Sequence, residues 1–501
     1  MVGKKLFWTV LVSVLLLKIF ILVLFPILGD EAYYFTWAQH PAGGYYDIAP
    51  MIAWWLYPYT KLNLPSEWFR ILMVIAHLGV AWMIASVCGK WSRFVFLVNL
   101  IAPLLIVNVI LIADWPLAFF YCAAGVVFFL ADQERSQRKS MLLAFASGLL
   151  LGLAFLSKYF AVTFFPSALV YLLFTKKDLK RSVLLLVTLG IGFLPGIAQH
   201  FFWNQENCFK TIQFNLFTRQ NAYDGTFANT FGHYWLYVLA LVGPAPLFFS
   251  KKFFLKSQDA VNPIERFALV QFLVPMALFC VSAISKGQGI HWYMSYQPWF
   301  WTWVALRLAR LDLVSLKAKI GLFLWPSIQA VAAITLLVLP IEKLRPSIGE
   351  RSWRDLVLTT SRDRVAKLIS DQPPVSAVIS DNYSYASVLS VAFKESGIHL
   401  PVGVFGPGVR FGRSFDAWMD WPSLDGKDML WIGRAFPPEL AGSFQSVEMI
   451  DPKGIPIAIL RGHGFIAQKY LQQYGADILQ NYYKKFSWER ACATRHYLGA
   501  E

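Results

Sequence analysis

Charged residues are scarce in this chain. Only 15% of its 501 residues are Asp, Glu, Lys or Arg, whereas 57% are hydrophobic and 17% are aromatic. Soluble domains carry roughly 25% charged and about 45–50% apolar residues, so the composition excludes an ordinary water-soluble domain. Apolar stretches of roughly 18 residues or more recur along the chain, and such stretches predict transmembrane helices. The sequence therefore predicts a polytopic α-helical membrane protein.

Cysteine is also rare, and its spacing carries no motif. The five cysteines form no CxxC pair and no zinc-binding pattern: Cys88, Cys122, Cys208, Cys280 and Cys492. We therefore expect no metal site and no bound cofactor, and we expect most of these thiols to be small core residues. Two of them, Cys208 and Cys492, fall on the same predicted side of the membrane, which leaves a disulfide between them open.

Basic residues outnumber acidic ones, giving a formal net charge of +15. An excess of this size could indicate nucleic-acid binding, but the Lys and Arg residues cluster in short loops between apolar runs. Cytoplasmic loops of membrane proteins carry such an excess. Loops on the side of the N-terminus hold most of this excess, so we expect a cytoplasmic N-terminus and no nucleic-acid partner.

About eleven transmembrane helices are predicted from the apolar runs. The first run lacks a small-residue cleavage site, so we interpret it as an uncleaved anchor rather than a signal peptide. The predicted spans are residues 7–28, 68–87, 94–112, 116–131, 141–156, 160–174, 183–203, 232–250, 265–284, 293–308 and 320–340.

The last third of the chain differs from the rest. In residues 341–501 the apolar runs shorten to about five residues, separated by Gly, Pro and Asp, with helical stretches between them. This pattern of short apolar runs alternating with helical stretches predicts a soluble α/β domain. An odd number of spans places it on the outer, periplasmic side. We therefore divide the chain into a transmembrane catalytic domain, 1–340, and a periplasmic α/β domain, 341–501.

An acidic pair, Asp30 and Glu31, follows the first apolar run. It opens a first periplasmic loop of about residues 29–66, whose many aromatics suit short helices in the headgroup zone. Carboxylates at the edge of lipid are costly and often functional. The alternative is that the two acids only mark the end of the helix and face water.

The predicted topology places further polar residues on the same outer side. Each has an ordinary alternative: Asp47 could form a turn, Asp114 could cap the next helix, Lys158 could snorkel, and His291 could belong to an interfacial aromatic belt. One shared site explains these polar residues better than a separate structural reason for each of them does. The set comprises Asp30, Glu31, Asp47, Asp114, Lys158, Arg219, Lys286 and His291.

Carboxylates beside cations suit a reaction between an acceptor hydroxyl and a lipid phosphate. A carboxylate accepts the hydroxyl proton, and the cations neutralise the departing phosphate. Five sequence elements match a known family in order along residues 1–340: DEAYYFTWAQH with GYYDxxPM, the Asp-Trp-Pro at 114–116, LAFLSKY, FFWNQE and SKGxxxHWYxxY. With these elements the chain resembles the bacterial polyprenyl-phosphate-sugar-dependent glycosyltransferases of the GT-C type. These are related to the protein O-mannosyltransferases and to the lipid A aminoarabinose transferase.

The resemblance implies an inverting, metal-independent displacement at the anomeric carbon of the sugar. It implies that Asp30 is the general base and that Glu31 orients it or the sugar. Asp114 and Asp47 would line the same pocket. The cations proposed for phosphate binding are Lys158, Lys286 and Arg219, and the remaining substrate-binding residues are His291 and Tyr293.

The chain departs from the family pattern after its tyrosine pair. It reads Asp47-Ile48-Ala49-Pro50 where many relatives have Asp-His-Pro-Pro. It also lacks the lysine of the Glu-Lys-Pro element that contacts phosphate in the aminoarabinose transferase. The departure makes Lys158 and Lys286 stronger candidates for binding the phosphate, and it argues against aminoarabinose as the sugar.

The favoured hypothesis is a transferase that moves a sugar from an undecaprenyl-type phosphate to lipid A or another part of lipopolysaccharide. The same chemistry could act on protein Ser/Thr or on another polysaccharide. A lipid-sugar flippase is a different class, but it should show several charges at the membrane midplane, and only Lys18 is placed there. An assembly protein would leave the outer carboxylates unexplained.

Overall fold

The computed structural model describes most of the chain. The described residues are 3–62, 64–175, 178–207, 209–218, 225–255, 262–339, 357–405, 413–434 and 438–475. Arg219, Cys208 and Cys492 lie outside them, so the predictions for these three residues concern a part that the structure leaves undescribed. The described thiols of Cys88, Cys122 and Cys280 are all free.

Seven helical segments in the described ranges are long and apolar enough to cross a membrane, so the chain is a multi-pass membrane protein. They are α1 (Lys4–Leu24), the joined η1 (Ser66–Arg70) and α4 (Ile71–Ser86), α6 (Asp114–Gln133), α7 (Gln137–Phe155), α9 (Leu179–Glu206), α14 (Pro263–Ser282) and α16 (Leu316–Val338). Shorter helices connect and flank them: α2 (Gly29–Gln39), α3 (Met51–Thr60), η2 (Gly89–Trp91), α5 (Ser92–Leu100), η3 (Tyr159–Thr163), α8 (Phe164–Thr175), α10 (Lys210–Gln213), η4 (Phe214–Thr218), α12 (Phe227–Val242), η5 (Ala245–Phe248), α13 (Lys251–Phe254), η6 (Ile290–Tyr293) and α15 (Gln297–Arg310).

The seven long segments coincide with seven of the eleven predicted spans. The other four predictions meet shorter helices: 94–112 meets α5, 160–174 meets η3 and α8, 232–250 meets α12, and 293–308 meets α15. The total of eleven stays a prediction.

The segment after α5 shows why one predicted span is short. Helix α5 ends at Leu100, and residues 101–113 are not helical. Pro103 lies in this segment and Leu104 takes a left-handed backbone conformation with φ of 60°, and both oppose continuation of a helix. The ammonium of Lys18 donates hydrogen bonds to the carbonyls of Leu105 (2.7 Å) and Asn108 (2.9 Å). Lys18, the charge that the sequence places at the membrane midplane, therefore stabilises an irregular segment. Without it, two carbonyls of that segment would lack hydrogen-bond partners.

The C-terminal part is an α/β unit, as the sequence predicts. Its five-stranded sheet has the order β2-β1-β3-β5-β4. β1 is parallel to β2 and β3, and β5 is antiparallel to β3 and β4, with Ile379 paired with Gly403 on one side and Trp431 on the other. The strands are β1 (Ala377–Ser380), β2 (Val402–Val404), β3 (Met429–Gly433), β4 (Phe444–Ile450) and β5 (Ala458–Phe465). The helices are α18 (Arg362–Ser370), α19 (Tyr383–Glu395), α20 (Ser414–Trp418), η7 (Pro422–Leu424), η8 (Pro438–Ser443), α21 (Ala467–Tyr470) and η9 (Leu471–Gly475).

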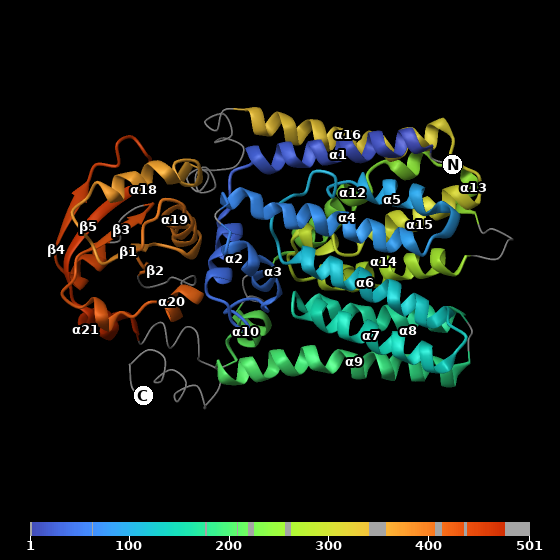
Figure 1. Cartoon of the computed structure of the whole chain (residues 1–501), viewed down its shortest axis with the longest axis horizontal. Helices are drawn as coiled ribbons and strands as arrows, with labels where there is room; N and C mark the ends of the chain where they lie inside the picture. The colour runs from blue at the N-terminus through green and yellow to red at the C-terminus, as the bar shows by residue number, and fades with distance from the viewer. Residues whose placement is uncertain are drawn as a thin grey trace.

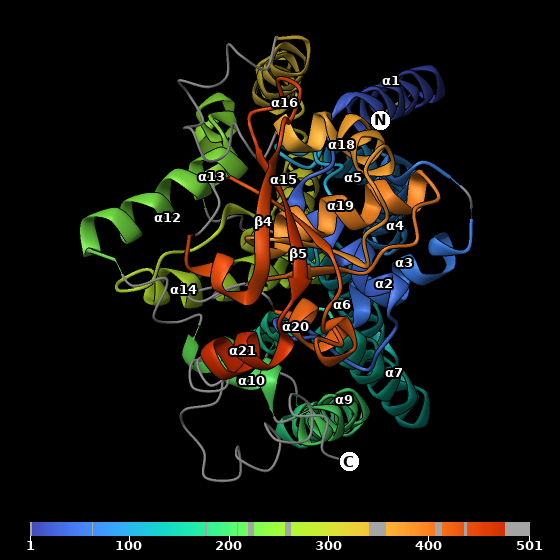
Figure 2. The ribbon, with the colours of Figure 1, turned by 90° about the vertical axis from the view of Figure 1, so that its left-hand side faces the viewer.

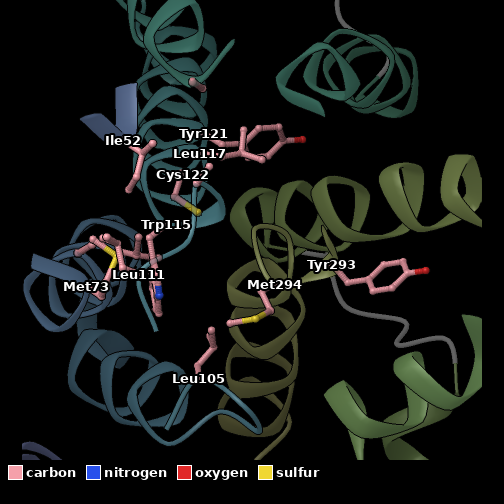
Figure 3. Packing of buried hydrophobic residues seen from close by; sticks show 14 of the residues in the cluster. Ile52, Met73, Leu105, Leu111, Trp115, Leu117, Tyr121, Cys122, Tyr293 and Met294 are labelled. Carbon is pink, nitrogen blue, oxygen red and sulfur yellow. The ribbon is translucent and has the colours of Figure 1, made fainter. Parts of the chain in front are cut away.

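The sheet domain lies at one end of the helical bundle, and α2 and α3 lie between the two (Figure 1). The view from the sheet side places α19 next to α2 and behind the strands (Figure 2). One continuous cluster of buried side chains runs from the bundle through α2 and α19 into the sheet. Figure 3 shows part of it, where Met73 of α4, Leu111 of the segment before α6, and Trp115 of α6 lie together in the bundle. The short helices after α1 are therefore packed between two folded parts and are not a solvated loop.

Helices α7 and α9 approach each other through glycine. A Cβ added at Gly192 would lie 2.2 Å from the carbonyl oxygen of Phe145 and 3.1 Å from Cα of Gly148. Such closeness is typical of small-residue contacts between membrane helices. Gly190, two positions earlier on the same helix, has no atom within 4 Å of an added Cβ.

We predict that Gly192→Ala lowers the melting temperature of the purified protein, because the added methyl forces the two backbones apart at a cost of about 1–3 kcal/mol. The matched control is Gly190→Ala, which should leave the melting temperature equal or slightly higher, since Ala favours helix over Gly. Thermal unfolding in detergent measures both variants. Equal melting temperatures for both would contradict the close packing.

Candidate active site

Helix α2 carries the first candidate carboxylate on its first turn. The helix begins at Gly29, and Asp30 is exposed at the junction between the bundle and the sheet domain. An acidic residue in a first turn is favoured by the positive end of the helix dipole. The hydroxyl of Tyr383, on α19, donates a hydrogen bond of 2.7 Å to Oδ1 of Asp30. Asp30 therefore lies where an external molecule can reach it.

Glu31 is placed differently from its neighbour. Its side chain is fully buried and forms an ion pair with Arg70, whose side chain is also fully buried. Its oxygens also accept hydrogen bonds from the backbone N–H groups of Leu28 (2.9 Å) and Leu111 (2.8 Å). Arg70 in turn donates to the carbonyl of Pro26 at 2.9 Å. This carboxylate ties the end of α1, the start of α2 and the segment before α6 together, so its geometry suits positioning rather than contact with a substrate.

The third candidate, Asp47, pairs with the sheet domain. Its Oδ2 accepts a hydrogen bond of 2.5 Å from Nη1 of Arg413, and both groups are largely buried. The Arg413 guanidinium also lies 3.8 Å from the ring centroid of Tyr383. Burial acts to lower the pKa of Arg413, but the Asp47 carboxylate, together with the neighbouring Tyr383, Tyr33 and Asp30, raises it above its usual value. Asp47 is thus part of an ion pair and not only a turn residue.

A second ion pair joins Asp114 and Lys158. The ammonium of Lys158 donates to both carboxylate oxygens of Asp114 at 2.8 Å, and the two side chains are 9% and 3% exposed. Asp114 is the first residue of α6, and the N-cap position belongs to Ala113. A lysine as buried as Lys158 does not reach out to water. Nε2 of His291 lies 4.0 Å from Oδ2 of Asp114, with 40% of its side chain exposed. The structure therefore brings Asp114, Lys158 and His291 together.

Tyr34, on α2, interacts with Asp30 and Asp47 and also with Asp114 of the second ion pair. Burial raises the pKa of its hydroxyl, and the negative charges of Asp30, Asp47 and Asp114 raise it further. All three carboxylates must be near this hydroxyl to act on it, because such interactions weaken with distance. Three of the four carboxylates that the sequence analysis placed on the outer side, Asp30, Asp47 and Asp114, thus act on the same hydroxyl.

The two other predicted residues within the described ranges are Lys286 and Tyr293. Lys286 follows α14 and is partly exposed. Tyr293 is fully buried, donates a hydrogen bond to Gln288 and packs against the rings of Tyr234 and Phe279. It points away from Trp115 (Figure 3). Their substrate roles stay predictions, and the position of Tyr293 suits packing better than contact.

Three residues of the site were missed in the sequence analysis. Arg70 was detectable, since an arginine at the start of an apolar run needs a partner. Tyr383 and Arg413 belong to the sheet domain, where no local motif marks them. Within the described ranges, no three His, Cys, Asp or Glu residues are grouped to hold a metal ion.

We predict that Arg70→Met strongly destabilises the protein, because it leaves the Glu31 carboxylate buried without its cation, at a cost of about 3–5 kcal/mol. The double variant Glu31→Gln/Arg70→Met should recover much of the loss, since no unpaired charge remains. Melting temperatures in detergent measure all three proteins. A double variant no more stable than the single one would contradict this account of the pair.

Comparisons with known proteins agree with this arrangement. Residues 40–203 match the dolichyl-phosphate-mannose-protein mannosyltransferase family. Over 446 residues the chain is 22% identical to the lipid A galacturonosyltransferase RgtD of Rhizobium johnstonii, covering 84% of this chain and 89% of that protein.

The crystal structures of ArnT from Cupriavidus metallidurans are similar to this chain in fold. The apo structure has a TM-score of 0.60 at 14% identity, covering 90% of this chain and 97% of ArnT. The structure bound to undecaprenyl phosphate has a TM-score of 0.63 at 15% identity, covering 92% and 98%. The chain therefore has the ArnT fold, and the resemblance to the GT-C type related to the protein O-mannosyltransferases, found in the sequence, is confirmed.

Proposed function

We propose that this chain transfers a sugar from a polyprenyl phosphate to lipid A, or to another part of lipopolysaccharide, at the periplasmic face of the bacterial inner membrane. The observation that carries the proposal is the exposed Asp30 carboxylate together with the buried Asp114–Lys158 pair, since Asp30 and Asp114 both act on the hydroxyl of Tyr34. A base that meets solvent and a fixed cation nearby are the two groups that this transfer needs.

The reaction is a single displacement. The acceptor hydroxyl oxygen attacks the anomeric carbon of the sugar, and the bond between that carbon and the phosphate oxygen breaks with inversion. The hydroxyl proton passes to Asp30. The polyprenyl phosphate leaves as an anion, so it needs cations rather than a proton donor. Lys158, Lys286 and Arg219 are the proposed cations, and His291 is placed to donate a hydrogen bond to sugar or phosphate.

The substrates are inferred from relatives and from charge. RgtD is a lipid A galacturonosyltransferase, and an ArnT structure contains undecaprenyl phosphate; together they support a polyprenyl phosphate donor and a lipid A acceptor. The basic loops on the side of the N-terminus support an outward-facing site. In this assignment residues 1–340 form the catalytic membrane domain and residues 341–501 the periplasmic domain.

A second candidate is the same transfer to protein Ser or Thr, which the match of residues 40–203 to protein mannosyltransferases supports. A transporter is less well supported. The one midplane charge noted in the sequence, Lys18, binds the carbonyls of Leu105 and Asn108, so it has a structural role that requires no transported ligand.

We predict that Asp30→Asn abolishes sugar transfer while the protein still accumulates in the membrane, because the amide cannot accept the hydroxyl proton. Mass spectrometry of lipid A and core oligosaccharide from cells with the wild type, the variant or a deletion measures the product. The mass lost on deletion, that of a hexose, hexosamine, uronic acid or pentosamine, also identifies the sugar.

The control for this variant is Asp371→Asn, which changes an exposed carboxylate at the end of α18 and should leave transfer unchanged. Normal modification by Asp30→Asn would contradict the assignment of the base. Glycan lost from periplasmic proteins with an unchanged lipid A would favour the second candidate.

We predict that Lys158→Ala raises the KM for the polyprenyl-phosphate donor at least about tenfold, the effect of losing one hydrogen bond to a charged group, with little change in the KM for the acceptor. Lys158→Arg should keep more of the donor affinity, because it keeps the charge. Reconstituted assays with varied donor and acceptor separate the two constants, and a melting curve of the same sample checks folding. An unchanged donor KM in the folded variant would remove Lys158 from the phosphate site.

A further inference from the structure

Helix α19 of the sheet domain meets α2 at the residue before Asp30. A Cβ added at Gly29 would lie 1.6 Å from Oγ and 2.7 Å from Cβ of Ser384. Gly29 is not among the glycines with positive φ, so its backbone does not require glycine. What requires glycine is the approach of α19. The contact between the two parts of the chain is therefore tightest beside the candidate base.

This approach places the Tyr383 hydroxyl on the base. It donates to Oδ1 of Asp30 at 2.7 Å. Burial raises the pKa of Tyr383, and the Asp30 carboxylate raises it further, so the hydroxyl keeps its proton and donates it. Among the described residues, Oδ2 of Asp30 has no hydrogen-bond partner, and the side chain is exposed. One oxygen is fixed by the sheet domain, and the other is open to an acceptor.

The ring of Tyr383 has two close neighbours, Arg413 and Tyr33. The guanidinium of Arg413 lies 3.8 Å from its ring centroid, and the ring of Tyr33, on α2, lies 4.9 Å away. Arg413 is itself held by the ion pair with Asp47. The hydroxyl of Tyr33 bonds to Ser414, the residue after Arg413, at 3.1 Å. The hydroxyl of Tyr383 is thus aimed by contacts from both domains.

We propose that Tyr383 is a positioning residue for the transfer reaction and that the sheet domain takes part in catalysis through it. The hydrogen bond to Oδ1 fixes the rotation of the Asp30 carboxylate, so that Oδ2 faces the acceptor hydroxyl. The inference rests on the proposed role of Asp30 as the base. It assigns to α19 a function beyond covering the membrane domain, since undocking of α19 would release the base.

Other contacts hold the two domains together without Tyr383. Nζ of Lys394 donates to the carbonyl of Thr60 at 2.9 Å, and the N–H of Ser66 donates to Glu395 at 2.7 Å. Arg362 pairs with Glu67. Removing the hydroxyl of Tyr383 should therefore leave α19 docked. The effect of Tyr383 on the orientation of Asp30 can thus be tested apart from the docking of the sheet domain.

The first test is Tyr383→Phe, which keeps the ring and removes the hydroxyl. We expect kcat to fall about tenfold, as for loss of one hydrogen bond to a charged group, with the KM for the donor unchanged. The matched control is Tyr385→Phe, which removes a hydroxyl buried in the sheet domain two residues along the same helix and should leave kcat unchanged. An unchanged kcat for Tyr383→Phe, or an equal fall in both variants, would overturn the positioning role.

The second test uses the contact at Gly29. We expect Gly29→Ala to lose most transfer, Ser384→Gly to keep most of it, and the double variant to recover activity, because Cα of Ser384 would be 3.2 Å from the new Cβ. Hydrogen exchange of the α19 amides gives a readout besides activity: it should rise in Gly29→Ala and return in the double variant. A double variant as inactive as Gly29→Ala would overturn the docking requirement.

The outcomes separate the inference from the proposed function. An active wild type with an unaffected Tyr383→Phe overturns the positioning role alone. A wild type that modifies neither lipid A nor protein overturns the proposed function, and the role of Tyr383 in catalysis with it. Exchange of the α19 amides that does not respond to Gly29→Ala overturns the docking contact itself.

Discussion

The site depends on the cost of burying charge. A carboxylate removed from water in or near a membrane is stable only with a cation and further hydrogen bonds. Each buried carboxylate of the site meets this requirement with a cation from a distant part of the chain: Glu31 with Arg70, Asp47 with Arg413, and Asp114 with Lys158. These three pairs draw α2, the end of α1, the segments before α6 and η3, and the sheet domain to one place. The requirement for charge pairing thus assembles the site.

Asp30 is the exception among these carboxylates, and the exception suits a base. In the described part of the chain its partner is a neutral hydroxyl, that of Tyr383, and its side chain is exposed. A carboxylate saturated by a guanidinium and two backbone N–H groups, as Glu31 is, has little capacity left to accept a substrate proton. The adjacent acids therefore have different tasks, because consecutive side chains on a helix point in directions about 100° apart.

Much of this could be predicted from the sequence, and the failures have physical causes. Apolar length identified the seven long helices, and motif spacing pointed to Asp30, Asp114 and Lys158, whose roles stay predictions. The helix expected over 94–112 failed because hydrophobicity does not reveal that Lys18 stabilises irregular backbone after Leu100. The burial of Glu31 and its ion pair could not be predicted, since its partner Arg70 is 39 residues away. Tyr383 and Arg413 could not be found, because only the docked fold brings them to the site.

The backbone of Arg413 supports a functional reason for this docking. It adopts φ of 51° and ψ of −125°, a conformation that costs a non-glycine residue about 1–3 kcal/mol. Glycine would adopt it freely, so the side chain must offset that cost. It does so through the pair with Asp47 and the face of Tyr383, and the next residue adds hydrogen bonds between Ser414 and Tyr33. An arginine held at a strained position, against the tyrosine that binds Asp30, would serve no purpose in a domain that only covers the membrane part. It is expected in a domain that orients the base.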